Sequence, residues 1–421
     1  MSATTGALSS AAAGVEGGSR RLRVLMLDEY FPYPPDSGKP IRTWNLLRRL
    51  AAHHDVTILC HGDLSAEQKS AAQSANIKFE SVASIEEASG FTLYGKLLVN
   101  LLSPYPYSVA KHFTARFAVK LAGLLTTQSF DLVHCEWTPY ARYLSDITLP
   151  TVIATHNIES QIWSRRAKRS ANPLAKLFFH LQAQKMERFE RDVLSQADMV
   201  SAVSDADANK AAAWGARHTC VVDNGVDLEY FSPQGAGDSN RAVFIGALDW
   251  FPNVDAIRYF ADAVLPLLPS LLPALRTKVI GRRAPVSLKA FLERRPGIEF
   301  AGEVPDTRPH LSEAGMVVVP LRIGGGSRLK ILEALAMGKA VVSTSIGAEG
   351  LAVTHGKDIL LADSPKEFAE AIAKLSASPE LRKSLGSQGR ALVEGRYGWD
   401  ALSQKAQQVW LDTVPARGSA V

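Results

Sequence analysis

The stretch MVVVPLRIGGGSRLKILEALAMGKAVVST, Met316 to Thr344, holds two short apolar runs with a glycine-rich turn and a helical pattern between them. The runs MVVVP and AVVST alternate little between apolar and polar residues, which is typical of strands that are buried on both faces. Between them, Leu329, Leu332 and Leu335 recur at helical spacing, and Gly338 is placed to end the helix. This order predicts two parallel strands of one sheet, joined by a helix that covers it.

The same alternation of apolar runs and helical patterns continues through the chain. Five strands are expected in each half, at 23–29, 55–60, 131–135, 151–155 and 198–203, then at 242–246, 278–281, 298–302, 316–320 and 340–344. Helical patterns lie between them, including 41–52, 115–125 and a long charged stretch over 159–195. Two such series predict an α/β protein with two Rossmann-like, doubly wound parallel-sheet domains that face each other across a cleft.

The length of the chain supports the same division. A chain of 421 residues is too long for one ordinary core, so two domains are expected. The junction is placed near the turn signal Asn224-Gly225, with an N-terminal domain over 22–217 and a C-terminal domain over 218–399. Residues 1–21 are small and polar and lack the features of a signal peptide, so a disordered tail is expected there.

Composition excludes several classes of protein. A net charge of +5 fits acidic partners such as phosphorylated molecules or anionic lipid, but it is also common on an ordinary solvated surface. No apolar run reaches the length of about 18 residues that crosses a bilayer. Cys60, Cys135 and Cys220 lie far apart, which indicates reduced thiols of a cytoplasmic protein. Neither a disulfide framework, a metal site nor a nucleic-acid partner is expected.

The glycine-rich turn is the main candidate for a binding site. Gly324, Gly325 and Gly326 would let backbone N–H groups approach an anion closely, and Ser327 is a plausible N-cap for the helix that follows. Two cations, Arg328 and Lys330, stand beside the turn, and Glu333 shares a helix face with Lys330. This composition fits a bound diphosphate with a hydroxylated ring held by the Glu. The alternative is a flexible loop with a surface Lys/Glu pair, and the turn alone does not decide between them.

Several blocks together resemble one enzyme family. GGGSRLKILEALAMGKAVVSTSIGAEGL, NGVD, YFPYPPDSGKPIRTWNLL and ATHNIES are similar to the GT-B glycosyltransferases of family 4, within them to bacterial sugar transferases associated with exopolysaccharide systems. The resemblance runs from about Leu22 to Trp410. It implies a nucleotide-diphosphate sugar donor, no metal or other cofactor, and retention of configuration at the anomeric carbon. It also implies that a C-terminal helix, at 400–415 here, crosses back to complete the first domain.

The resemblance assigns roles to residues of the second domain. Glu333 matches the second Glu of the family's paired-Glu motif, which holds the nucleotide ribose, whereas Gly325 stands in the place of the first. After the first strand of this domain, Gly246 matches a family glycine, but Ala247 replaces the Arg that usually follows it. Arg328 and Lys330 are therefore expected to carry the phosphate charge. Asp249, and Asn253 beyond it, would contact polar parts of the donor or serve only in the loop.

The resemblance also assigns roles in the first domain. Gly38 opens a helix at the place of the family's glycine loop near the donor phosphates, and Arg42 adds positive charge there. His156, directly after TVIAT, matches the family's histidine beside the reacting sugar, although a structural hydrogen bond is the plainer role for a His at a strand end. His134 and Glu136, at the end of DLVHC, are expected to line the cleft edge and meet the acceptor, a polysaccharide or lipid-linked glycan.

Two other motifs favour structural roles or a partner surface. The Asp-x-Asp pattern within Ser204 to Asn209 follows a strand and starts a helix, so capping is expected instead of metal binding. The stretch Trp163 to Asp192 combines cations with apolar residues such as Leu174 and Leu177. It is either a packed surface helix or an element that lies on an anionic inner membrane.

Two alternatives to sugar transfer stay open. A GT-B nucleotide-sugar epimerase would share the fold but carry different catalytic acids near the donor. A nucleotide-sugar-binding protein without activity is the other, because the first Glu and the Arg of the family motifs are missing. No G-x-G-x-x-G follows a strand, which argues against a dehydrogenase.

Overall fold

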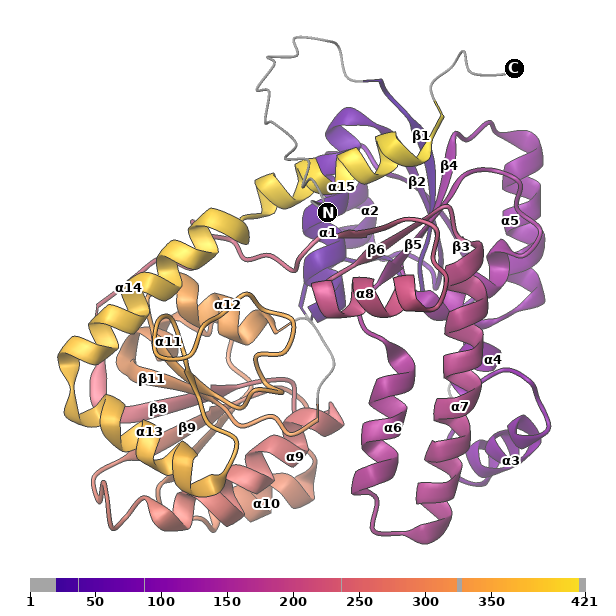
Figure 1. The fold of residues 1–421 in the computed structure, drawn as a ribbon. Helices are drawn as coiled ribbons and strands as arrows, with labels where there is room; N and C mark the ends of the chain where they lie inside the picture. Colours follow the sequence, from indigo (N-terminus) through magenta and orange to yellow (C-terminus); the bar gives the residue numbers. More distant parts are fainter. Residues whose placement is uncertain (1–19, 37, 87, 236, 324–327, 416–421) are drawn as a thin grey trace, which may run out of the picture.

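The chain folds into two α/β domains, each built on one parallel sheet (Figure 1). The computed structural model describes residues 20–36, 38–86, 88–235, 237–323 and 328–415. Within these residues the strand orders are β3-β2-β1-β4-β5-β6-β7 and β10-β9-β8-β11-β12-β13. In each sheet the second and third strands lie on one side of the first strand, and the later strands lie on its other side. The predicted fold class, two doubly wound domains, is confirmed.

The strands agree with the apolar runs of the sequence. Those of the first sheet are β1 (Arg23–Leu27), β2 (Asp55–His61), β3 (Lys78–Val82), β4 (Leu132–Cys135), β5 (Thr151–Thr155), β6 (Met199–Ala202) and β7 (Thr219–Val221). Those of the second are β8 (Asp238–Ile245), β9 (Arg276–Ile280), β10 (Ile298–Gly302), β11 (Ala314–Val319), β12 (Ala340–Ser343) and β13 (Leu360–Leu361). β3, β7 and β13 were not among the ten expected strands, and all three are edge strands. There, a strand needs no continuous apolar run.

Helices cover both sheets. The first domain contains α1 (Gly38–His53), α2 (Ala66–Ser74), α3 (Gly90–Leu101), α4 (Tyr107–His112), α5 (Ala115–Thr127), α6 (Glu159–Arg169), α7 (Pro173–Gln196) and α8 (Asp205–Ala213). The second contains α9 (Phe251–Tyr259), α10 (Val286–Glu293), α11 (Arg308–Glu313), α12 (Leu329–Ala336), α13 (Pro365–Ala377) and α14 (Pro379–Arg396), after which α15 (Trp399–Thr413) follows. None of the described helices is long and apolar enough to span a membrane.

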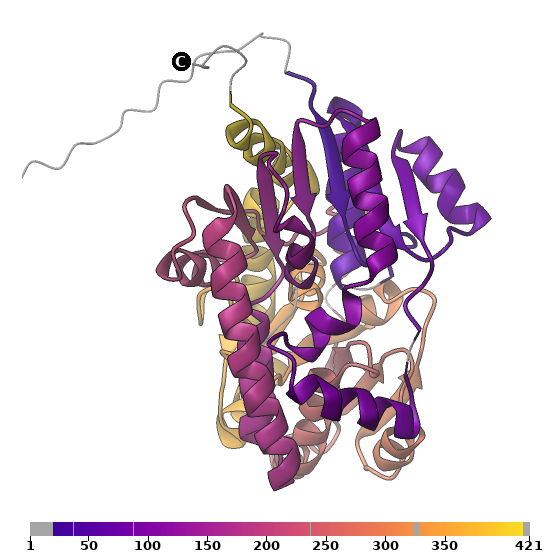
Figure 2. The same ribbon diagram turned by 90° about the vertical axis from the view of Figure 1, so that its right-hand side faces the viewer.

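The long charged stretch expected over 159–195 forms two helices instead of one. Asn172 accepts hydrogen bonds from the N–H groups of Leu174 and Ala175, and Pro173 occupies the first turn of α7. An N-cap followed by proline is a strong helix start, which is why the chain breaks there. The helices α6 and α7 pack together as a hairpin, and α7 extends from the first domain with α3 beside its lower half (Figure 2).

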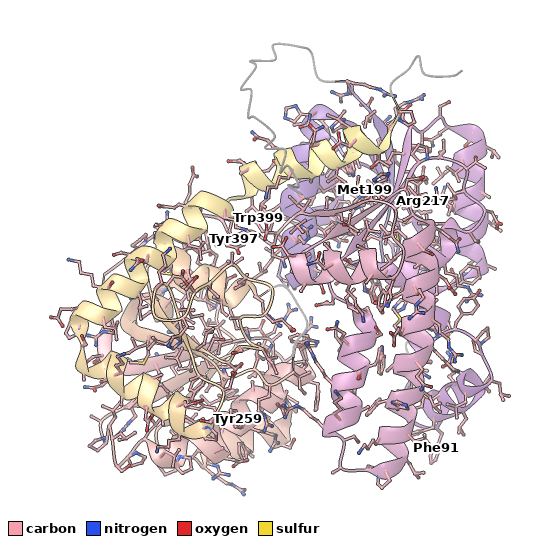
Figure 3. All side chains as sticks on the ribbon, viewed as in Figure 1. Phe91, Met199, Arg217, Tyr259, Tyr397 and Trp399 are labelled. Carbon is pink, nitrogen blue, oxygen red and sulfur yellow. The ribbon has the colours of Figure 1, made fainter. Side chains whose placement is uncertain are left out.

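The last helix crosses between the domains (Figure 1). Its buried side chains, Trp399, Leu402, Val409 and Trp410, belong to the core cluster on one face of the first sheet. Tyr397 and Trp399 mark the crossing point (Figure 3). Because β7 pairs with β6, the first sheet also extends beyond the boundary expected between 217 and 218. The first domain is therefore completed from two separate parts of the chain.

The three cysteines are free thiols, as expected. Cys60 and Cys135 are buried in central strands, and Cys220 is half-buried in β7. Burial in apolar surroundings raises the pKa of all three thiols. They serve as small apolar side chains in the first sheet.

Candidate active site

A cleft of about 770 Å³ lies between the two domains, where the carboxyl ends of the sheets face each other. In the first domain its walls are formed by residues that follow β1 and β5, and in the second by residues at the ends of β8, β9, β10 and β11 or directly after them. Open parallel sheets place ligands at these ends, because the strands stop there and the helices begin. The cleft is therefore the candidate binding site.

Helix α12 presents its polar face to this cleft. Ile331, Leu332 and Leu335 are fully buried in the second domain, while Lys330 and Glu333 line the cleft. The helix ends as predicted, since Gly338 follows it with φ of +66°, a conformation that favours glycine. The alternation of buried and cleft-facing residues leaves the two charged side chains one helical turn apart on the exposed face.

Lys330 is held by a residue from the neighbouring helix. Its Nζ donates to Asn253 Oδ1 at 2.6 Å, and Asn253 Nδ2 donates to the carbonyl of Ala247 at 2.8 Å. Gly246 lies under both groups: a Cβ there would stand 2.8 Å from Lys330 Nζ and from Asn253 Nδ2. A side chain at 246 would therefore push the ammonium out of place.

Burial brings the two charged groups of α12 close to neutrality. Both side chains are only partly buried, so they also meet the water of the cleft. Burial lowers the pKa of Lys330 to about 7, and the charge of Arg328 lowers it further, while Glu333 acts in the opposite direction. Burial likewise raises the pKa of Glu333 to about 7, against the effect of Lys330. Perturbed groups of this kind are frequent at functional sites.

Arg328 stands at the N-cap of α12 with φ of +52°, a left-handed conformation that is uncommon outside glycine. Its Nη2 lies 3.4 Å from a carboxylate oxygen of Glu349, and its Nε donates to the carbonyl of Glu349 at 3.3 Å. Burial lowers the pKa of Arg328 to about 10, so it stays charged at neutral pH. The cation is thereby fixed where the cleft meets the start of the helix.

Three other residues predicted for the donor site line the cleft. They are Gly38, which begins α1, Gly246 and Asp249. Asp249 also pairs with Arg283, at 3.4 Å. Gly324, Gly325, Gly326 and Ser327 lie outside the described residues. Arg328, the first described residue after this segment, lines the cleft.

Arg42 does not reach the cleft, contrary to the sequence expectation. Its side chain is buried, and Nη2 donates to the carbonyl of Val222 at 3.0 Å. Position 42 lies on the face of α1 that packs onto the first sheet, so the guanidinium points to the segment after β7. It ties the chain leaving the first sheet to α1 and is not a donor contact.

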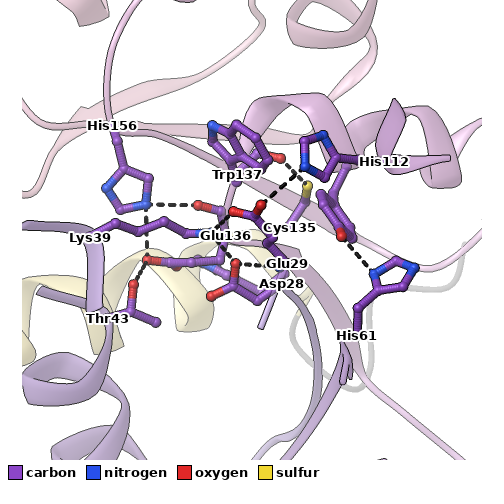
Figure 4. A network of polar contacts seen from close by, with 12 residues as sticks. Asp28, Glu29, Lys39, Thr43, His61, His112, Cys135, Glu136, Trp137 and His156 are labelled. Carbon is purple, nitrogen blue, oxygen red and sulfur yellow. Dashed lines mark hydrogen bonds and ion pairs between the residues drawn. The ribbon is translucent and has the colours of Figure 1, made fainter. Parts of the chain in front are cut away.

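His156 follows β5 and lines the cleft from the side opposite α12. Its Nε2 lies 2.8 Å from the carbonyl oxygen of Glu136 and 3.2 Å from Glu136 Oε1 (Figure 4). Both oxygens are acceptors, so Nε2 carries a proton and donates it. The ring is fixed from behind, and Nδ1 remains for the cleft.

His134 and Glu136 lie behind His156, which corrects their predicted place at the cleft edge. Both are buried and neither lines the cleft. Glu136 accepts from Thr43 Oγ1 at 2.7 Å (Figure 4) and from His134 Nε2 at 2.8 Å. Burial works against its charge, but the hydrogen bonds from His134 and His156 outweigh it and hold the pKa of Glu136 well below its ordinary value. Alternate residues of a strand face opposite sides of the sheet, and His134 faces the side covered by α15.

Lys39 is a cleft residue that the sequence analysis did not single out. It follows Gly38, and its ammonium pairs with Asp28 and lies 3.9 Å from Glu29 (Figure 4). Burial opposes the charge of Lys39, but the two carboxylates raise its pKa above the ordinary value. The signal in the sequence was a lysine at the start of the helix that follows the acidic strand end Asp28-Glu29.

Other expectations concerned metals and caps. Among the described residues, no cluster of His, Cys, Asp or Glu has the make-up of a metal site. Ser204 caps α8, and its hydroxyl accepts from the N–H of Asp207 at 3.2 Å. The Asp-x-Asp pattern thus belongs to a helix start, as predicted.

The two halves of the chain match two family models. Residues 38–230 match the model described as Glycosyltransferase Family 4, and residues 239–378 match the model described as Glycosyl transferases group 1. The two matches meet close to the junction between the sheets. Together they span most of the chain.

Curated relatives agree with these models. A D-inositol 3-phosphate glycosyltransferase of Kribbella flavida is 30% identical over 51% of this chain, and the match spans 56% of that relative's length. An uncharacterized glycosyltransferase of Methanocaldococcus jannaschii is 22% identical over 92% of this chain and 98% of its own.

Solved structures share the fold over nearly the whole chain. HepE of Anabaena, in complex with UDP and glucose, has a TM-score of 0.64 at 16% identity and covers 92% of this chain and 99% of its own. Sucrose-phosphate synthase of Thermosynechococcus elongatus has a TM-score of 0.69 at 15% identity and covers 93% and 99%. Two Rossmann-like domains face each other across a cleft, and each domain matches one of the two family models. The chain therefore belongs to the family 4 glycosyltransferases of the GT-B fold.

Proposed function

We propose that this protein is a retaining glycosyltransferase that moves a sugar from a nucleotide-diphosphate sugar to a hydroxyl of a polysaccharide or lipid-linked glycan. The observation that carries the proposal is the polar face of α12 in the cleft. There Lys330 and Glu333 stand one turn apart, with Arg328 at the start of the helix. HepE of Anabaena was solved in complex with UDP and with UDP-glucose, so a uridine nucleotide is the first donor to test.

The diphosphate of the donor would lie at the start of α12. Lys330 and Arg328 supply positive charge there, and the positive end of the helix dipole favours an anion. As the bond between the anomeric carbon and the diphosphate oxygen breaks, negative charge grows on the leaving group. The two cations stabilise this charge in the transition state.

Glu333 would hold the ribose of the nucleotide. Its carboxylate can accept two hydroxyl hydrogen bonds, and it stands one helical turn beyond Lys330. That spacing matches the order of diphosphate and ribose in a nucleotide that lies along α12. The ionised form is needed for this contact.

His156 would contact the reacting sugar from the first domain. Its Nε2 proton is committed to Glu136, so Nδ1 is the atom that meets a sugar hydroxyl. The acceptor oxygen then bonds to the face that the diphosphate leaves, and the acceptor's proton passes to the departing diphosphate. Neither step requires a protein nucleophile.

Release of nucleoside diphosphate tests the proposal. Purified protein is incubated with UDP-glucose and related nucleotide sugars, with and without a lipid-linked or polysaccharide acceptor fraction. Release that depends on the acceptor, with the new linkage in the α configuration of the donor, supports retaining transfer. Interconversion of the donor sugar without an acceptor indicates an epimerase, and tight binding without turnover indicates an inactive binding protein.

We also propose that the acceptor is met at an anionic membrane surface. Helix α3 and its C-cap residue expose an apolar stripe to solvent, with Phe91 97% exposed (Figure 3) and Leu102 91% exposed. The stripe runs through Phe91, Tyr94, Leu98 and Leu102, which recur at helical spacing. An exposed apolar helix face is unusual for a surface that meets only water.

The neighbouring hairpin adds positive charge to the same side of the first domain. The C-terminal end of α3 is bound to α7, since Lys185 Nζ donates to the carbonyls of Asn100 and Leu101 at 2.8 and 3.0 Å. At the far end of α7, Leu174 is exposed beside the exposed cations Lys168 and Lys176. Apolar residues flanked by lysines fit the headgroup region of an anionic bilayer.

Co-sedimentation with vesicles tests the membrane proposal. Binding to vesicles with phosphatidylglycerol, lost in Phe91→Asp, is the expected result. Val119→Asp replaces another exposed apolar residue, on α5, and serves as the control that keeps binding. Equal recovery of wild type and Phe91→Asp with anionic vesicles would reject α3 as the docking element.

A further inference from the structure

A buried chain of hydrogen bonds links the C-terminal helix to the active-site histidine. Trp410, on α15, donates its indole N–H to His134 Nδ1 at 3.0 Å. His134 Nε2 then donates to Glu136 Oε2 at 2.8 Å, and Glu136 holds His156 Nε2 through its carbonyl and Oε1. Each of these four residues is at most 9% exposed.

The direction of each hydrogen bond is set by the tryptophan. An indole N–H can only donate, so His134 Nδ1 must be the unprotonated nitrogen. His134 Nε2 must then carry the proton that goes to Glu136. This geometry fixes His134 as the neutral Nε2–H tautomer and leaves Glu136 as the ionised acceptor between two imidazoles.

The ionised Glu136 in turn fixes His156. Both oxygens near His156 Nε2 belong to Glu136 and both accept, so the proton of His156 is held at Nε2. Thr43 Oγ1 donates to the same carboxylate at 2.7 Å and blocks its rotation. The orientation of the ring and the position of its lone pair are decided by residues that never touch the substrate.

We propose that Trp410 and Glu136 are positioning residues for sugar transfer, through which α15 sets the tautomer and orientation of His156. The proposal rests on the proposed function, because it assigns His156 to the reacting sugar. It adds a contribution of the C-terminal helix to the chemistry, besides its packing role. Without the indole N–H, nothing holds His134 as the Nε2–H tautomer, so Glu136 loses a fixed donor and holds His156 less firmly.

The variant Trp410→Phe removes the indole N–H and keeps a large aromatic side chain. Trp399→Phe is the matched control, since Trp399 is a buried tryptophan of the same helix and the same core cluster, and it takes no part in the chain to His156. Both variants lose similar packing, so they differ mainly in the hydrogen bond. Thermal unfolding of both checks that the loss of packing is comparable.

Histidine tautomers give a readout that does not depend on activity. In a long-range ¹H–¹⁵N spectrum of protein with labelled histidine, the signals of His134 and His156 are assigned with His134→Gln and His156→Gln. The Nε2–H pattern is expected for both in the wild type and in Trp399→Phe, and it is expected to be lost at His134 in Trp410→Phe. An Nδ1–H pattern at His134 in the wild type would overturn the proposal.

Kinetics test the functional part. Trp410→Phe is expected to lower kcat about tenfold with the donor KM within twofold, since a hydrogen bond that orients the catalytic group is lost while the donor contacts remain. Glu136→Gln is expected to lower kcat further, and the double variant to lose no more than Glu136→Gln alone, because both act through one chain.

The outcomes separate this proposal from the proposed function. If His156→Ala abolishes transfer while Trp410→Phe and Trp399→Phe both turn over like the wild type, the positioning role is wrong and the catalytic role of His156 stands. If His156→Ala itself keeps wild-type turnover, the assignment of His156 to the reacting sugar fails, and the positioning role fails with it.

Discussion

Lys330 and Asn253 join two helices that follow neighbouring strands of the second sheet. The distance from Lys330 Nζ to Asn253 Oδ1 is 2.6 Å, and β8 and β11, which precede α9 and α12, are paired in the sheet. The same ammonium lies 5.0 Å from the centre of the Phe244 ring. A side chain that is usually mobile is thus held at one point of the cleft wall.

Removal of this cation should nearly abolish transfer. In Lys330→Ala the leaving diphosphate loses one of its two side-chain cations, and the loss of one such stabilising group costs about 3 kcal/mol, roughly a hundredfold in kcat. The melting temperature should stay close to that of the wild type, because Lys330 is only partly buried. Lys366→Ala removes a lysine from the exposed surface of α13 and should leave kcat unchanged. Wild-type turnover by Lys330→Ala would remove the central assignment of the site.

A single methyl group at 246 should have a similar but weaker effect. In Gly246→Ala the new Cβ would stand 2.8 Å from Lys330 Nζ, so the ammonium must shift away from Asn253. The affinity for UDP should fall about tenfold, which isothermal titration calorimetry can measure. Gly123→Ala is the control, since a Cβ at 123 in α5 meets nothing within 4 Å. If both variants bind UDP equally well, binding of the diphosphate does not depend on the position of Lys330 Nζ.

Nucleotide binding should take up a proton above pH 7. The pKa of Lys330 is lowered to about 7 by burial, so this side chain is mostly neutral in the free protein at pH 8. A bound diphosphate favours the charged form and raises the pKa again, so the affinity for UDP should fall as the pH rises from 7 to 9. Titrations at pH 8 in two buffers with different ionisation enthalpies give the number of protons. Lys330→Met should bind weakly and without this uptake.

Below pH 7, the dependence of the affinity for UDP on pH should be set by Glu333. Its pKa is raised to about 7 by burial, so it is largely protonated at pH 6, and contact with ribose hydroxyls through an ionised carboxylate requires loss of that proton. The affinity for UDP should therefore also fall as the pH drops from 7 to 6. In Glu333→Gln the fall in affinity below pH 7 should disappear, while the fall above pH 7 should stay. If the affinity of the variant still falls below pH 7, another group causes that fall.

Stability of the first domain should fall in mild acid because of His54. Burial lowers the pKa of His54 to about 4, and its Nδ1 accepts the N–H of Leu22 at 3.2 Å. Between pH 6.5 and 4 the unfolded chain binds a proton that the folded state does not, so stability is lost as the pH falls through this window. From pH 7 to 5 the loss should be about 2 kcal/mol for this residue.

The variant His54→Asn isolates this contribution. Its amide oxygen can still accept from Leu22, but it does not titrate, so the free energy of unfolding should depend less on pH than in the wild type. Urea unfolding at pH 7 and pH 5 measures the difference. The neighbouring His53 is exposed, and His53→Asn should keep the wild-type pH dependence. An unchanged pH dependence in His54→Asn would contradict the lowered pKa.

Much of the architecture could be predicted from local pattern. Buried parallel strands such as β5 and β11 read as continuous apolar runs, and the order of runs and helices predicts two doubly wound sheets. The cleft-facing residues of α12 could also be predicted, because Leu329, Leu332 and Leu335 mark the buried face and leave Lys330 and Glu333 on the other. These features depend on spacing along one short segment.

The errors arise where distant segments decide which way a side chain points. Arg42 stands one turn after Gly38 at the cleft, but carbonyls after β7 draw it to the opposite side of α1. His134 ends a central strand as a cleft residue would, but it points under α15, to Trp410. The partner in each case is more than a hundred residues away, and a single sequence does not show it.

The path of α15 has a consequence for how the protein is made. Trp399 and Trp410 fill the core of a domain whose first strand is Arg23–Leu27, so that core is incomplete until nearly all of the chain has left the ribosome. The second domain, which is contiguous over its own sheet, can close earlier. During synthesis the apolar surface that awaits α15 is open to water, and a nascent chain stalled before residue 399 should be a substrate for chaperones.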